Sequence, residues 1–133
     1  MLWVKTFFGI LFQTILLGIF LYLPALTLNW SDAFLLLTIH FLMTILASAY
    51  LLIVKPESIE ARMNYDSKTQ PKEDRLATAL MFSAIFVGLS LAPIDIFHLN
   101  LSSSFEGSIK NIGLAIYIIG MLLFMASLNA NEF

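Results

Sequence analysis

The stretch "AFLLLTIHFLMTILASAYLLIV", residues 33–54, contains no Asp, Glu, Lys or Arg over 22 positions. A helix of that length covers the hydrocarbon core of a bilayer, which takes about 20 apolar residues. Just before it, Ser31 or Asp32 can cap the start of the helix, and Trp30 is a side chain typical of the membrane interface. The stretch therefore predicts a transmembrane helix.

The rest of the chain has the same character. Its 133 residues are 59% hydrophobic and 12% charged, with a mean hydropathy of +0.89, whereas soluble domains are about 25% charged. Four segments approach the length of a span, at residues 2–23, 33–54, 76–92 and 109–128. The first and third end at Pro24 and Pro93. The apolar run Phe7–Leu23 is too long for a signal peptide and has no clear cleavage site after it, so it is read as a retained span.

Four such helices predict an all-α membrane protein that forms one transmembrane domain, residues 1–133, because each helix satisfies its own backbone hydrogen bonds in lipid. The expected architecture is an antiparallel bundle. Its short outer connections predict that the first helix packs beside the second, and the third beside the fourth.

The basic residues predict an orientation. Six of the seven, Lys5 and five in the 55–75 loop, lie at one end of the predicted bundle, and only Lys110 lies at the other. Because Lys and Arg accumulate in cytoplasmic segments, we expect both termini and the 55–75 loop in the cytoplasm, with the lipid bilayer around the bundle.

Composition excludes several kinds of site. The chain has no cysteine and therefore no disulfide, thiolate metal ligand or cysteine nucleophile. A net charge of -2 argues against a nucleic-acid partner. We expect no metal site, because His98 and Asp95 supply too few ligands, and the sequence identifies no catalytic or cofactor-binding residue.

Few polar side chains lie inside the predicted spans, and His40 is the one titratable group at depth. It is either a proton relay or ligand, or a neutral imidazole hydrogen-bonded to Gln13, a threonine hydroxyl or a backbone carbonyl. The second interpretation is favoured, because no carboxylate or second histidine accompanies His40. His40 and Gln13 are candidates for a structural contact.

The loop "KPESIEARMNYDSKTQPKEDR", residues 55–75, is the longest polar segment, with ten charged residues among its 21. It can simply anchor the ends of two spans, punctuated by Pro56 and Pro71. Within it, residues 57–63 predict a short interfacial helix with Ile59 and Met63 facing the membrane.

The order of residues in this loop resembles the connection between early spans in bacterial members of the isoprenylcysteine carboxyl methyltransferase family. There, Asn-Pro-Glu-Leu-Leu and Glu-Arg precede Lys-x-Trp-Asp-Arg. The positions at or near a match are Pro56, Glu57, Arg62, Lys72, Asp74 and Arg75. Lys55, Ala61 and Glu73 depart from the pattern. The segment "MASLNANEF" also resembles the junction before the family's catalytic half, so the likeness covers residues 55–133.

The resemblance implies the N-terminal membrane half of such an enzyme, in a bacterial or archaeal cytoplasmic membrane. The family's catalytic half binds S-adenosylmethionine through Gly-Pro-Tyr and Arg-His-Pro-x-Tyr segments, and neither is present here. The chain alone is therefore expected to be inactive, with that half or another membrane protein as its partner. Arg62, Asp74 and Arg75 would pair with one another, which is the favoured interpretation, or with that half.

Two other functions fit the sequence. One is a small non-enzymatic four-span protein that acts as a scaffold or assembly partner in the membrane. The weaker one is a small transporter, which would depend on His40 as the ionisable group at depth.

Overall fold

The computed structural model describes residues 1–64, 71–101 and 107–130, apart from the side chains of Arg62 and Asn129. These residues form helices without a strand. The helices are α1 (Leu2–Ala25), α2 (Ser31–Val54), α3 (Pro56–Met63), α4 (Lys72–Ile94), the π-helical turn η2 (Asp95–Leu99) and α5 (Gly107–Ala130). In the described part, α1, α2, α4 with η2, and α5 are long and apolar enough to cross a membrane. The predicted fold class, an all-α membrane protein with four transmembrane helices, is confirmed.

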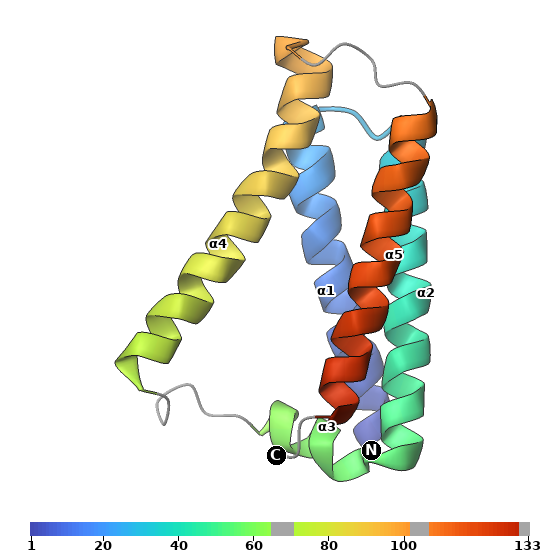
Figure 1. The fold of residues 1–133 in the computed structure, drawn as a ribbon, viewed down its shortest axis with the longest axis vertical. Coiled ribbons are helices and arrows are strands. Elements are labelled where there is room, and N and C mark those ends of the chain that lie inside the picture. Colours follow the sequence, from blue (N-terminus) through green and yellow to red (C-terminus); the bar gives the residue numbers. More distant parts are fainter. Residues whose placement is uncertain (65–70, 102–106, 131–133) are drawn as a thin grey trace.

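The helices α1 and α2 form the centre of the bundle and run antiparallel (Figure 1). They approach closely at Gly18, where a Cβ atom would lie 3.5 Å from Leu37 Cδ1. Helix α4 packs on α1 and α5 packs on α2. The prediction that the third and fourth spans are neighbours is therefore wrong: side-chain contacts with α1 and α2 decide where α4 and α5 lie.

Pro93 does not end its span where the sequence predicted, whereas the first span ends one residue after Pro24. Helix α1 continues past Pro24 to Ala25, and α4 continues past Pro93 into η2. Because Pro24 has no N–H, the carbonyl of Phe20, four residues earlier, loses its partner in the helix. The Ser90 hydroxyl of α4 donates to this carbonyl across a distance of 3.4 Å. A proline in α1 thus creates a point of attachment for α4.

Aromatic contacts hold the same part of α4. The rings of Phe20 and Phe86 are stacked, with centroids 4.3 Å apart. Nearer the end of the bundle, Trp30 and Phe97 meet edge to face at 5.3 Å. Both are favourable geometries for aromatic pairs.

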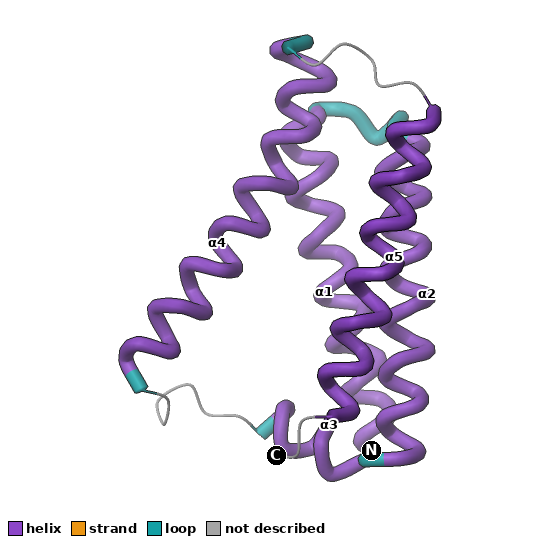
Figure 2. Tube along the Cα trace, viewed as in Figure 1, coloured by secondary structure: helices purple, strands orange, loops and turns teal. Residues whose placement is uncertain are grey.

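The first half of α4 lies away from the other helices. Figures 1 and 2 show the helix inclined, with its Lys72 end far from α1. From residue 72 to residue 85, every residue except Thr78 is exposed. Helix α4 is therefore held through its second half.

At the same end of the bundle as the start of α4, the predicted short helix is present as α3. Its Ile59 is buried with Leu51 and Leu52 of α2, and Leu2 and Leu128 pack against this cluster. The expectation that Ile59 faces the membrane is therefore wrong. A single residue, Lys55, separates the end of α2 from Pro56, the first residue of α3, and the turn at this point brings Ile59 onto the end of α2.

Candidate functional site

Polar side chains from three helices meet near the middle of the bundle. His40 of α2 is 6% exposed. Its Nδ1 lies 2.6 Å from the Tyr117 hydroxyl of α5, and its Nε2 lies 3.5 Å from the Gln13 amide of α1. The structure therefore places Gln13, one of the three partners that the sequence left open, beside His40. It adds Tyr117, which the sequence did not indicate.

One arrangement of protons gives the three groups their partners. If the Tyr117 hydroxyl donates to Nδ1, the ring proton of His40 is on Nε2 and can be donated to the amide oxygen of Gln13. The amide presents that oxygen after a half-turn of its terminal group, an exchange that leaves its shape almost unchanged. The opposite tautomer donates to Tyr117 and leaves the phenol proton without an acceptor. The arrangement that satisfies each group has a neutral imidazole.

Threonines do not take part in this contact. The Thr44 hydroxyl donates to the carbonyl of His40 at 2.8 Å, and Thr38 and Thr14 make the equivalent bond four residues back in their own helices. Such bonds satisfy a hydroxyl within one helix and do not join helices. Of the expected partners of the imidazole, Gln13 is the one that the structure provides.

Gln13 has hydrogen-bonding capacity to spare. Its side chain is exposed at the surface of the described bundle, and its one hydrogen bond there is the long contact with His40. A primary amide has two donors and two acceptor positions. Because hydrocarbon supplies no hydrogen bonds, an exposed amide at this depth is a site at which another polar group would bind.

The other predicted candidates lie at the end of the bundle that carries α3. Asp74 and Arg75 are exposed in the first turn of α4, and neither forms an ion pair with another described residue. Asp74 is favourably placed at the positive end of the helix dipole. The expected pairing of Asp74 with Arg75 is therefore not found. The side chain of Arg62, like residues 65–70, lies outside the described part, so pairing of Arg62 with Asp74 stays a prediction.

At the opposite end, Lys110 of α5 forms an ion pair with Asp32 of α2, with 2.6 Å between Nζ and Oδ2. His98 Nε2 donates to the Pro24 carbonyl at 2.7 Å, and Asp95 Oδ1 accepts the Leu101 N–H at 2.8 Å. These contacts join helix ends. In the part of the chain that the structure describes, no three His, Asp or Glu residues are grouped closely enough to hold a metal ion.

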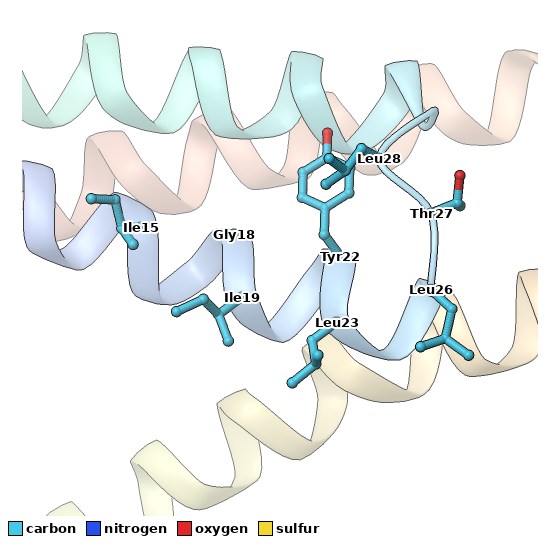
Figure 3. Close-up of a pocket in the computed structure, with 8 residues that line it drawn as sticks. All are labelled: Ile15, Gly18, Ile19, Tyr22, Leu23, Leu26, Thr27 and Leu28. Carbon is cyan, nitrogen blue, oxygen red and sulfur yellow. The ribbon is translucent and has the colours of Figure 1, made fainter.

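The surface also carries apolar grooves. The groove in Figure 3, about 510 Å³, follows one face of α1 and is lined by Ile15, Ile19 and Leu23 among others. A second, about 360 Å³, lies between α2 and α5 and includes Met43 and Met125. Neither lining includes a charged side chain or a histidine, and the polar side chains in them are Tyr22, Thr27 and Tyr50. Both grooves are therefore suited to hydrocarbon.

Comparison with protein-family models, curated proteins and solved structures gives no match to this chain.

Proposed function

We propose that this chain is the N-terminal membrane half of an isoprenylcysteine carboxyl methyltransferase-like enzyme, in a bacterial or archaeal cytoplasmic membrane. The main support is the position of the residues that carry the sequence resemblance. Helix α3, the first turn of α4 and the last turn of α5 lie at one end of the bundle (Figure 1). A catalytic half that follows α5 would therefore begin at the same end of the bundle as the family-like residues.

The distribution of basic residues supports a cytoplasmic location for this end of the bundle, the end that carries α3. Lys5, Lys72 and Arg75 all belong to it, whereas Lys110 belongs to the other end, where it pairs with Asp32. Under the positive-inside rule, both termini and the 55–75 loop are then cytoplasmic. This is the side from which a water-soluble cofactor enters.

The catalytic half would dock on the first turns of α4, the end at Lys72 that lies away from the other helices (Figure 1). Asp74 and Arg75 are exposed and make no ion pair with another described residue, while Leu76 and Leu80 expose an apolar strip beside them. An apolar surface edged by charges gives both contact area and a fixed register to a partner. In this proposal the chain shelters a lipophilic substrate, and S-adenosylmethionine binds to the other half.

The first test is to read the source DNA beyond the Phe133 codon. The proposal expects Gly-Pro-Tyr and Arg-His-Pro-x-Tyr segments in the same frame or an adjacent one. A stop codon with no such segment nearby would remove the enzyme from consideration.

If the segment is found, S-adenosylmethionine binding is measured by titration calorimetry on the 133-residue chain and on the chain joined to that segment. Saturable binding is expected only for the second. Arg75→Ala should reduce co-purification of separately expressed halves, whereas Lys110→Ala, at the opposite end, should not. Saturable binding to the 133-residue chain alone would contradict the proposal that S-adenosylmethionine binds to the other half.

A second function, a non-enzymatic membrane scaffold or assembly partner, is favoured by the exposed amide of Gln13 at mid-depth. It expects an oligomer or a co-purifying membrane protein in mild detergent, lost in Gln13→Leu. A chain that is monomeric and without partners under these conditions would count against it.

A further inference from the structure

A pocket at the α3 end of the bundle is lined by opposite charges that do not pair. The pocket has a volume of about 230 Å³. Lys5 of α1 lines one side, and Glu60 of α3 and Asn64, the residue that follows α3, line the other. Neither Lys5 nor Glu60 makes an ion pair with another described residue. The pocket therefore presents a cation, a carboxylate and an amide to a shared space.

The two walls of this pocket meet at a buried cluster. Leu2, three residues before Lys5, packs against the cluster that contains Ile59, the neighbour of Glu60. Leu2 also lines the pocket. Lys5 and Glu60 therefore border the same cavity.

The pocket lies at one end of the spans, the level at which phospholipid headgroups are expected. Lys5 is in the first turn of the span α1, and a lysine near the end of a span directs its ammonium group to the interface. Three and seven residues further along α1, Phe8 and Phe12 are 62% and 69% exposed. These rings continue from Lys5 along one face of the helix toward the bilayer interior and offer an apolar track for acyl chains.

From this charge complementarity we infer that the pocket binds the headgroup of phosphatidylethanolamine. The phosphate accepts hydrogen bonds from Lys5, the primary ammonium donates to Glu60 and to the amide oxygen of Asn64, and the acyl chains follow Phe8 and Phe12. The site is independent of the proposed enzyme and of which side of the membrane it faces.

The same chemistry discriminates between phospholipids. Phosphatidylcholine has no N–H to donate to Glu60 or Asn64. Phosphatidylglycerol has no cation, and its phosphate is repelled by the Glu60 carboxylate. The pocket therefore selects a zwitterion whose cation is a hydrogen-bond donor.

The test uses a tryptophan beside the site. The 133-residue chain carrying Phe8→Trp, with Trp3→Phe and Trp30→Phe, is placed in bilayers in which one lipid class at a time has brominated acyl chains that quench fluorescence. Quenching of the tryptophan by brominated phosphatidylethanolamine, relative to quenching by brominated phosphatidylcholine, gives the ratio of the two binding affinities. This ratio is expected to be about three, the scale of a solvent-exposed ion pair. Glu60→Gln should bring the ratio close to one, and Lys5→Gln should lower it.

Glu57→Gln is the matched control, because Glu57 is an exposed carboxylate of the same helix that does not line the pocket. It should leave the ratio unchanged. Circular dichroism of each variant in the same bilayers checks that the helices are retained. Equal quenching by both zwitterionic lipids, stronger quenching by phosphatidylglycerol, or an unchanged ratio in Glu60→Gln would overturn the assignment.

Discussion

Helices α4 and α5 are attached to the central pair in different ways. Helix α5 contacts α2 along its length: an ion pair at Lys110, a hydrogen bond at Tyr117 and packing of Leu128 at the α3 end. Its half-buried residues recur every three or four positions, at 114, 117, 118, 121, 125 and 128, which is one helical stripe. Helix α4 contacts α1 only through its second half, where Ser90 and Phe86 lie.

The difference shows what positions a helix in lipid. Apolar surface alone does not choose a neighbour, because lipid tails are as apolar as leucine. Where polar groups and close ring contacts are distributed along a helix, as on α5, the whole helix is aligned. Where they are confined to one half, as on α4, the other half diverges. Substitutions that remove these contacts one at a time test this difference.

The largest effect is expected for His40→Ala. It removes both hydrogen bonds of the central contact and leaves Gln13 and Tyr117 without their partner, at a cost of about 1–2 kcal/mol of bundle stability. Unfolding measured by steric trapping in bicelles gives the free energy. Thr38→Ala is the control, because the Thr38 hydroxyl bonds only within α2. Equal stability of His40→Ala and the control would show that the contact has no structural role.

Tyr117→Phe should cost about 0.6 kcal/mol, the mean value of a hydrogen bond between membrane helices. Only the hydroxyl is lost, so the change isolates the bond between α5 and α2. The distance between spin labels on these two helices should also broaden. Tyr50→Phe, an exposed tyrosine of α2, is expected to change neither the free energy nor the distance.

Ser90→Ala should cost a similar or smaller amount, up to about 0.6 kcal/mol, because the bond to the Phe20 carbonyl is longer at 3.4 Å. Its clearer result is geometric: spin labels at the starts of α1 and α4 should report a wider range of separations. Ser83→Ala, at an exposed serine of the same helix, is the control. An unchanged distribution in Ser90→Ala would mean that the ring contacts alone hold α4.

The smallest effect is expected for Asp32→Asn. Both side chains of the Lys110–Asp32 pair are more than half exposed, so loss of the pair should cost less than about 0.5 kcal/mol. The cost should disappear in 1 M salt, where exposed charges are screened over about 3 Å. A cost that does not depend on salt would show that Asp32 contributes through something other than this exposed ion pair or the helix dipole, both of which salt screens.

The sequence predicted the spans well, because hydropathy over about 20 residues is a property of each segment alone. It also named Gln13 among the alternative partners of His40, with a threonine hydroxyl and a backbone carbonyl, since polar groups at mid-depth need partners. It missed Tyr117, because whether its hydroxyl faces His40 depends on the rotation of α5 about its own axis, which the sequence pattern does not give. It likewise missed Ser90, because the carbonyl that Ser90 satisfies is freed by a proline on another helix.

The neighbours of α4 and α5 were predicted wrongly for a related reason. A short connection limits how far apart two helix ends lie, but it does not determine which side chains of the four helices fit together. The stacking of Phe20 on Phe86 and the burial of Ile59 on α2 depend on such pairings. Such contacts depend on how two helix surfaces fit together, and the hydropathy pattern of a single segment does not determine that fit.

Attachment at one half also makes α4 a lever arm. From Phe86 to Lys72 the helix extends about 21 Å at 1.5 Å per residue, so a rotation of about 10° at the Phe20–Phe86 contact displaces its free end by about 4 Å. Asp74 and Arg75 lie at that free end. A small change in ring packing inside the bundle would therefore displace charged groups at its end by more than the shift that produced it.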